Sequence, residues 1–300
     1  MKRLTLILFC LFAGLIAYSQ NDTILIKMMT YNIRHGAGMD DVVDLDRQAA
    51  VIQNALPDVV GLQEVDSVVK RSGYIPEAAI LGNKVGMHAT FGPAIPLTGG
   101  KYGVAILSKE VPLSVRNIPL PGEEKRTLLV CEFERYVFAT THLDLNDSCR
   151  TASLPIILEE VARWDKPFFI CGDWNAEPSS TLIKTIKKSF NILNNLISNS
   201  ANYTFPANNP KSIIDYIASY NRVVSRKPKV INEPNASDHR PVVVDVKFEV
   251  IATGIHSPSA NGELMQDEEV YDLTGKKVES NRLTSGLYIL KNSRKKVVIR

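Results

Sequence analysis

The sequence predicts an α/β sandwich, in which two β-sheets pack together and helices lie outside them. Short apolar runs rich in Val, Ile, Phe and Tyr recur through most of the chain, as expected for strands. These runs are residues 24–33, 58–65, 103–108, 127–133, 136–143, 167–173, 212–219 and 240–248. Few helical patterns separate them, and 45% of the 300 residues are apolar, enough for a large core. Many strands with few helices favour the sandwich architecture.

Helical periodicity appears in three segments, residues 44–58, 151–164 and 178–190. In the first segment one face of the expected helix carries Leu45, Ala49, Ile52 and Leu56. Ser179 or Ser180 is placed to cap the third helix at its N-terminus. We expect these helices to pack their apolar faces onto the sheets.

Residues 1–19 are typical of a secretory signal peptide. Two positive charges precede an apolar run and then small residues, and we expect cleavage after Ser19. The apolar run, residues 4–17, is short for a membrane span. Cys10 could indicate a lipoprotein, but Phe9 is bulky where lipoprotein processing needs a small residue. The sequence therefore predicts a protein that is secreted or held at the cell surface.

The cysteines of the mature chain do not form an even set. Cys131 and Cys171 lie in apolar runs that read as strands, and Cys149 is the third. We expect the first two to be core residues, since free cysteine behaves as a small apolar side chain. An exported protein of this kind depends on a large core and not on disulfides.

The charge distribution argues against tight nucleic-acid binding. The formal net charge is +3, of which Lys2 and Arg3 supply two in the leader. Residues 263–300 hold eight Lys or Arg against six Asp or Glu, which leaves a net charge of −1 for the part between. Nucleic-acid binders usually show a clear basic stripe. Nucleic acid is therefore a possible partner but not the favoured one. We also expect the protein to be a monomer.

Two further segments follow the main strand-rich region, residues 24–250. Residues 251–262 are rich in Gly, Ser, Pro and Asn and are predicted to be a linker. Residues 263–300 read as a small strand-rich unit with Gly turns, too short to build much core of its own.

The polar residues that stand out occur where strands meet loops, the usual place for a site on a sheet scaffold. They are Asn32, Glu64, His142, Asp173, Asn175, Asp215, Asp238 and His239. Each alone could be a turn residue, a rim carboxylate or a core histidine. Asp215 is harder to explain in that way, because it lies inside an apolar run where a lone acid would be buried without compensation. It requires a cationic or hydrogen-bonding partner, and histidine is a natural one.

These residue types fit one kind of chemistry. Oxygen ligands from Glu, Asp and Asn suit a hard cation such as Mg²⁺ or Mn²⁺. Histidines with carboxylate partners suit proton transfer. The chain has no HExxH, no CxxC pair and no P-loop, so a zinc-thiolate or ATP-driven reaction finds no support in it.

Seven motifs in order make the chain resemble the endonuclease/exonuclease/phosphatase superfamily, which includes deoxyribonuclease I and the sphingomyelinases. They are TYNIR, LQEVD, YGVAILS, THLD, GDWNAEP, IDYI and SDHRPV, and the likeness spans residues 24–250. The resemblance implies a four-layer α/β sandwich, with two mixed sheets flanked by helices. It also implies metal-dependent cleavage of a phosphate ester.

The resemblance implies a role for each matching residue. Glu64 corresponds to the principal ligand of Mg²⁺ or Mn²⁺, with Asn32 and Asp238 nearby. His239 corresponds to the acid/base histidine, which Asp215 orients.

Four more catalytic positions match. Asp173 and Asn175 correspond to the pair that activates water and holds the phosphate, His142 to the second histidine and Tyr102 to a phosphate-contacting tyrosine. Either Asp173 or His239 takes the proton from the attacking water. Val104 is a minor departure, since many similar secreted bacterial members have Asn there.

The substrate is the open question. Four cationic or polar residues lie beside or between the motifs and are expected to bind a compact, highly charged group of the substrate, although each could instead form a surface salt bridge. They are Arg34, His35, Arg71 and Arg126. With the near-neutral body, they favour a small or lipid-linked phosphate ester over DNA or RNA. An extracellular nuclease is the alternative. A fold that only displays a binding surface would lack carboxylates or histidines, and none is missing.

The C-terminal segment, residues 263–300, resembles the sorting domains of Bacteroidetes proteins exported by type IX secretion. The matching stretches are YDLTGKKV and GLYILKNSRKKVVIR. The resemblance implies recognition by outer-membrane secretion machinery. An ordinary small β accessory domain is the alternative.

Overall fold

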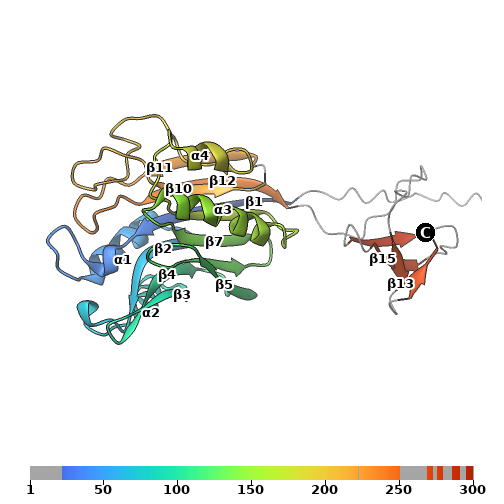
Figure 1. Ribbon diagram of the computed structural model, residues 1–300, viewed down its shortest axis with the longest axis horizontal. Coiled ribbons are helices and arrows are strands. Elements are labelled where there is room, and N and C mark those ends of the chain that lie inside the picture. The colour runs from blue at the N-terminus through green and yellow to red at the C-terminus, as the bar shows by residue number, and fades with distance from the viewer. Residues whose placement is uncertain are drawn as a thin grey trace, which may run out of the picture. The chain divides into compact units, whose positions relative to one another are not determined.

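Two six-stranded mixed sheets form the body of the protein in a computed structural model (Figure 1). The first sheet has the order β11-β12-β1-β2-β4-β3. Its strands are β1 (Asp22–Asn32), β2 (Val59–Ser67), β3 (His88–Leu97), β4 (Gly100–Ser108), β11 (Ser225–Val230) and β12 (Val242–Val250). The second sheet has the order β5-β6-β7-β8-β10-β9. Its strands are β5 (Ser114–Leu120), β6 (Arg126–Glu132), β7 (Val137–His142), β8 (Phe168–Asp173), β9 (Asn191–Ile192) and β10 (Asp215–Ser219).

The structure describes residues 22–221, 223–250, 269–272, 276–279, 286–290 and 295–299. Residues 23–250 form one compact unit, to which the fold and site below refer. The expected signal peptide, residues 1–19, and the expected linker, residues 251–262, lie outside the described residues. Among the described residues, no helix is long and apolar enough to cross a membrane.

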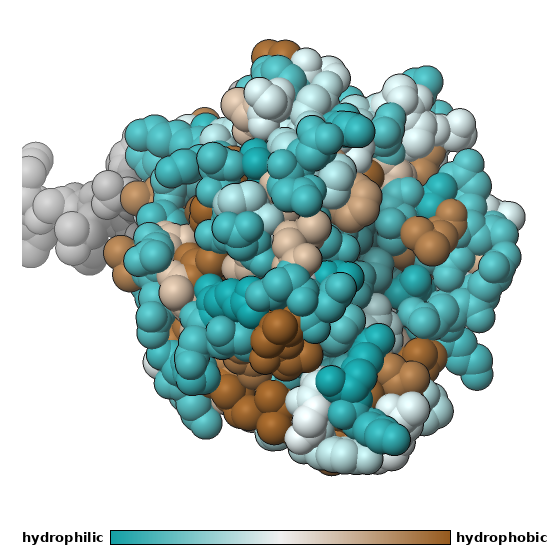
Figure 2. Space-filling view, turned by 90° about the vertical axis from the view of Figure 1, so that its left-hand side faces the viewer, coloured by the Kyte–Doolittle hydropathy of each residue, from teal (hydrophilic) through white to brown (hydrophobic). Residues whose placement is uncertain are grey.

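Hydrophilic residues cover most of the face drawn in Figure 2, whereas three apolar clusters in the interior define four layers. One cluster lies between the sheets and includes Met28, Phe138 and Phe169. A second packs α1 (Leu45–Ala55) and α2 (Glu77–Val85) against the first sheet. A third packs α3 (Asp147–Val161) and α4 (Thr181–Ile186) against the second sheet. The order is therefore helices, sheet, sheet, helices (Figure 1), which confirms the predicted four-layer sandwich.

The predicted helices are present, with one correction at a helix end. Leu45, Ala49 and Ile52 are buried as expected, but Leu56 is 68% exposed. It adopts the left-handed conformation with φ 53° and caps α1, because Pro57 cannot continue a helix. The third helix begins after Ser180, whose hydroxyl accepts a hydrogen bond from the amide of Ile183.

Several elements were not predicted. They are α2 and the strands β3, β5, β9 and β11. The strands among them lie at or near the sheet edges and are partly exposed, so their sequences lack a continuous apolar run. Cys131 and Cys171 are free and buried, as expected for core residues, and Cys149 is also free.

The described parts of the C-terminal segment form a separate small sheet. Its strands are β13 (Val270–Asp272), β14 (Lys277–Val278), β15 (Gly286–Leu290) and β16 (Lys295–Ile299). They pair antiparallel in the order β14-β13-β15-β16, in agreement with the strand-rich pattern of the sequence.

Candidate active site

The candidate site lies where the ends of the two sheets meet, and contacts between the sheets fix that meeting point. Gln63 donates a hydrogen bond of 2.8 Å to Thr140 Oγ1 on the facing sheet. Gly61 permits the close approach, since a Cβ there would collide with Cys171 Sγ. Small and paired polar residues thus let the strand ends of both sheets contribute to one place.

Strand register brings three of the predicted residues together. The parallel pair β7 and β8 places His142 opposite Asp173. The antiparallel pair β8 and β10 places Asp215 opposite Asp173 on the other side. All three side chains are buried, with residue exposures of 7%, 2% and 1% in that order. The last residue of β8 is therefore the centre of a row across three strands.

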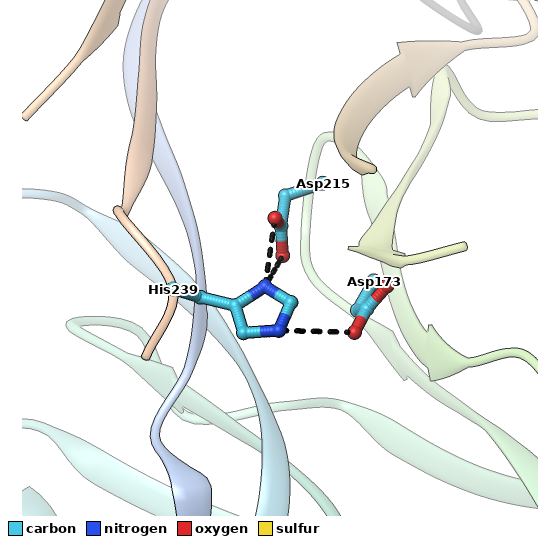
Figure 3. Close-up of side chains that lie close together, drawn as sticks. All are labelled: Asp173, Asp215 and His239. Carbon is cyan, nitrogen blue, oxygen red and sulfur yellow. Dashed lines mark hydrogen bonds and ion pairs between the residues drawn. The ribbon is translucent and has the colours of Figure 1, made fainter. Parts of the chain in front are cut away.

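His239 lies between two carboxylates. Its Nδ1 is 2.9 Å and 3.1 Å from the two carboxylate oxygens of Asp215, and its Nε2 is 3.6 Å from Asp173 Oδ2. Figure 3 shows each acid at a different nitrogen of the imidazole. The short contacts to Asp215 place the hydrogen on Nδ1 and fix the ring orientation, as a carboxylate does for a catalytic histidine.

This arrangement shifts the pKa values of both His239 and Asp173. Burial lowers the pKa of His239, but the carboxylates of Asp215 and Asp173 outweigh it and raise the pKa above its ordinary value. Burial raises the pKa of Asp173, and His239 opposes that rise. The imidazolium is therefore favoured at neutral pH, and Asp173 binds a proton more readily than an exposed aspartate.

Asn32 joins this group to Glu64. Its Nδ2 donates to Glu64 Oε1 at 3.0 Å and to Asp173 Oδ2 at 3.2 Å. Glu64 stands at a bulge of β2, between Leu62 and Val65, with φ 57°. A bulge redirects a side chain, and a left-handed non-glycine residue is strained, as is common at functional sites. The strained backbone directs Glu64 toward the row of strand ends.

The residues around Glu64 fit a divalent cation. Burial raises the pKa of the Glu64 carboxyl, and the negative charge of Asp238 adds to the rise. A buried glutamate whose ionisation a neighbouring carboxylate opposes is a group that a cation would stabilise. Asn32 Oδ1 accepts one hydrogen bond, from the amide of Arg34, which leaves a second lone pair for a ligand.

Asp173, Asp215 and His239 also offer ligand atoms within 4.8 Å of one another. However, Nδ1 of His239 is bonded to Asp215, and coordination there would break that contact. Glu64, Asn32 and Asp238 therefore fit a cation better than this group does, and the cation ligands stay a prediction.

His142 lies between two donors and Asp173. Arg126 Nη1 is 3.3 Å from Nδ1, and Asn175 Nδ2 is 3.1 Å from Nε2. A neutral imidazole accepts at one ring nitrogen only, so His142 accepts a hydrogen bond from either Arg126 or Asn175. Nε2 also lies 3.5 Å from Asp173 Oδ2. Burial and Arg126 lower the pKa of His142 well below its ordinary value, so it is a neutral imidazole beside Asp173.

The three predicted arginines have different surroundings. Arg34 donates to the carbonyl of Gly38 at 2.8 Å, pairs with Asp41 at 2.7 Å and lies 3.9 Å from Asp238. Arg126 is only 7% exposed and pairs with Glu124 at 2.9 Å, so it supports His142 from within the protein.

The third arginine, Arg71, pairs with Asp66 and lies 5.4 Å from the centre of the Tyr102 ring. Tyr102 is nearly buried and pairs with Asp66 across β4 and β2. The predicted substrate-binding role of these arginines stays a prediction.

Sequence reasoning assigned no role to several residues that support the site. Asp66 beneath Arg71 and Asp144 beside Arg126 are buried acids that end the motifs LQEVD and THLD, and those motifs were the signal that could have indicated them. Glu77 is a buried acid outside the motifs. Phe205 lies with its ring 4.7 Å from the His239 ring.

Arg240, to which the sequence assigned no role, holds the loop that carries His239. Its Nε donates to the carbonyl of Ala207 at 2.7 Å, and its amide donates to the carbonyl of Thr204 at 2.7 Å. Ser237 Oγ donates to the carbonyl of Asn32 at 2.7 Å. The Arg240 bonds hold the loop before β12 against residues 204–207, and the Ser237 bond holds it against the end of β1.

Cavity size does not locate this site. A hollow of about 360 Å³ lies between α1 and β11 and is lined by residues including Lys27, Lys227 and Asp245. Another of about 620 Å³ lies beside β9. Neither contains a residue of the row described above, so the chemistry of the side chains identifies the site.

By class, the protein is an α/β sandwich that places a buried glutamate beside a histidine held between two acids. Residues 29–239 match the model of the Endonuclease/Exonuclease/phosphatase family, and the chain belongs to this family. Its members are hydrolytic phosphoesterases and nucleases, and they typically depend on a divalent metal.

Solved structures show the same fold. A family protein from Bacteroides vulgatus is 19% identical, with 75% of this chain and 100% of that chain covered and a TM-score of 0.61. One from Beutenbergia cavernae is 18% identical, with 92% of each chain covered and a TM-score of 0.59. The catalytic domain of human Nocturnin, with a bound sulfate anion, is 22% identical, with 76% and 97% covered and a TM-score of 0.55.

Proposed function

We propose that this chain is a secreted phosphoester hydrolase that uses Mg²⁺ or Mn²⁺ and cleaves a small or lipid-linked phosphate ester by in-line attack of water. The observation that carries the proposal is His239, held by Asp215 at 2.9 Å and facing Asp173, beside the Asn32–Glu64 pair. Glu64, Asn32 and Asp238 would hold the cation, which when bound neutralises charge on the phosphoryl group.

The remaining residues would accept a proton from the attacking water or stabilise the charge that develops on the phosphoryl group. The raised pKa of Asp173 suits it to accept the proton of the attacking water, and the imidazolium of His239 compensates the negative charge that develops. Neutral His142 and Asn175 lie side by side, with Asn175 Nδ2 3.1 Å from His142 Nε2. These groups are placed to donate hydrogen bonds to phosphoryl oxygens. One preorganised donor of this kind stabilises a transition state by about 3 kcal/mol. Tyr102 is a third candidate donor.

Substitution of the central residues tests the mechanism. His239→Ala and Glu64→Ala are each expected to abolish hydrolysis of bis(4-nitrophenyl) phosphate while the circular dichroism spectrum stays native. His88→Ala is the matched control, since His88 is exposed on β3 and far from the row of strand ends. Hydrolysis that survived both active-site substitutions would rule out this mechanism.

A substrate panel tests the substrate class. Plasmid DNA, RNA, inositol phosphates, sphingomyelin and a chromogenic phosphodiester are compared with Mg²⁺, with Mn²⁺ and with a chelator. We expect cleavage of a small or lipid-linked ester, because the body carries no bulk positive charge to hold a polyanion. An extracellular nuclease is the second candidate, since the family includes nucleases. Cleavage of nucleic acid alone would establish it instead.

We also propose that residues 1–19 direct export and that residues 263–300 engage outer-membrane secretion machinery. The charged and apolar leader and the strand-rich tail support this. Deletion of residues 263–300 is expected to retain the enzyme inside the cell envelope. Unchanged secretion of the shortened chain would contradict the sorting role and would favour a small accessory domain.

A further inference from the structure

Arg71 is fixed in place at the edge of the site. Its Nε and Nη2 donate to the two carboxylate oxygens of Asp66 at 2.8 Å and 2.9 Å. The Asp66 side chain is fully buried, whereas the Arg71 side chain is 42% exposed. The pair is therefore anchored from below and reaches solvent on its outer edge.

Two neighbours stiffen this anchor. Glu77 is buried and its Oε2 accepts a hydrogen bond of 2.8 Å from the Asp66 amide. The Tyr102 ring lies under the guanidinium, 5.4 Å from its carbon to the ring centre. A guanidinium has five N–H donors in one plane, and the Asp66 carboxylate uses two of them. Among the described residues no hydrogen bond to Arg71 Nη1 is found, so its donors point away from the anchor.

His35 is a second polar group without a partner at this edge. It lies in a left-handed turn with Arg34 and Gly36, where φ is 48°, 45° and 74° for residues 34 to 36. Such a conformation costs roughly 1–2 kcal/mol for each non-glycine residue and is retained mostly at functional sites. The imidazole has no hydrogen bond to any described residue, and its Nδ1 is buried.

His35 and Arg71 belong to one group of charges. Burial lowers the pKa of His35, and Arg71 lowers it further, while Asp66 and Asp238 oppose this. Arg71 also acts on the Glu64 carboxyl. Geometry places the turn against the same anchor, since a Cβ on Gly36 would lie 3.3 Å from Glu77 Oε1, and Glu77 holds Asp66 beneath Arg71. His35 is therefore a neutral imidazole near this anchor. Because its Nδ1 is buried, Nε2 is the nitrogen that can donate to an anion.

We propose that Arg71 and His35 form a subsite for a second anionic group of the substrate, beside the scissile phosphoester. The proposal rests on the function proposed above and narrows it to phosphate esters that carry a further phosphate or similar anion. Tyr102, a candidate donor to the scissile phosphoester, lies beside the subsite with Arg71 over its ring. Arg34 is a weaker candidate, because Asp41 and the Gly38 carbonyl already engage it.

Calorimetric binding of non-hydrolysable probes tests the subsite without relying on turnover. Alkane bisphosphonates with two to six methylene groups are compared with the monophosphonates of the same length, in saturating Mg²⁺. For at least one chain length, the wild-type protein is expected to bind the bisphosphonate at least tenfold more tightly. The series covers the unknown spacing between the two anionic groups.

Two variants remove the proposed contacts. Arg71→Ala and His35→Gly are each expected to reduce the bisphosphonate advantage to less than threefold. Glycine at position 35 keeps the left-handed backbone without strain, so that variant is expected to fold. Arg116→Ala is the matched control for Arg71, because Arg116 is 43% exposed and holds the buried Glu160 through two bonds of 2.8 Å and 3.1 Å.

The outcomes separate the subsite from the proposed function. A tenfold advantage that falls in both site variants and persists in Arg116→Ala supports the subsite. No advantage at any chain length, or an advantage that Arg71→Ala retains, overturns it. If wild-type protein shows the advantage yet hydrolyses no phosphate ester of the panel, the hydrolase proposal fails and the anion subsite stands.

Discussion

Replacing Asp215 with asparagine removes the negative charge behind His239 and keeps an oxygen that can accept from Nδ1. The carboxylate oxygens lie 2.9 Å and 3.1 Å from Nδ1, and Asp215 is 1% exposed. In so buried a place, solvent screens the charge little, and the carboxylate raises the pKa of His239. In Asp215→Asn, the pKa of His239 is therefore expected to fall and the neutral imidazole to predominate at pH 7.

The expected loss of activity follows from the lost charge. A hydrogen bond to a charged group contributes about 1.5–3 kcal/mol, against about 1 kcal/mol for a neutral one. Loss of electrostatic stabilisation at a reacting centre lowers kcat by roughly 100-fold to 1000-fold. The assay is hydrolysis of bis(4-nitrophenyl) phosphate with Mg²⁺, with Asp245→Asn on β12 as a control away from the site.

The dependence of Tm on pH gives an independent test of whether Asp215 controls the charge of His239. The pKa of His239 is raised in the folded protein, so its contribution is full below the unfolded value of about 6.5 and is lost as pH rises through the folded value. The pKa of His239 is raised to about 10, and each unit of such a rise corresponds to about 1.4 kcal/mol, or roughly 3–6 °C in Tm for a domain of this size. Wild-type Tm should therefore fall more steeply than that of Asp215→Asn between pH 6 and pH 10.

The reasoning is refuted by one combination of results. If Asp215→Asn keeps wild-type kcat and the same slope of Tm against pH, Asp215 does not control the charge of His239. A drop in kcat with an unchanged slope would assign Asp215 a purely geometric role.

Three other predictions follow from single residues. Glu64→Gln should abolish activation by Mg²⁺ and weaken calorimetric Mn²⁺ binding at least tenfold, because it removes a buried carboxylate; unchanged Mn²⁺ binding would contradict its assignment as a ligand. Burial raises the pKa of Glu77 to about 8, so its stabilising effect is lost as pH rises toward 8. Glu77→Gln should therefore flatten the dependence of Tm on pH between pH 5 and pH 8, and an unchanged slope would show that Glu77 does not titrate there. Leu56→Gly should raise the stability by about 1 kcal/mol in chemical denaturation, since Leu56 is exposed with φ 53°, and a loss of stability would mean that its side chain packs.

Much of the fold could be predicted from local sequence. The apolar runs that form β1, β2, β4, β6, β7, β8, β10 and β12 are continuous because these strands are mostly buried. Edge strands such as β11, with Lys227 and Lys229 exposed, escaped prediction because half of their surroundings is water. The same limit applies to α2, whose short apolar face gives a weak signal.

The sequence by itself determined which residue types gather at the strand ends, because buried strands end where polar groups can again reach water or each other. Only the tertiary structure decided their partners. Asp215 and Asp173 are 42 residues apart, yet the register of β8 and β10 makes them neighbours on either side of His239. Arg126 and Arg71 look alike in sequence, but one is buried behind His142 and the other reaches solvent beside Tyr102. Burial and pairing depend on contacts between distant segments, and those contacts set the charge of each group.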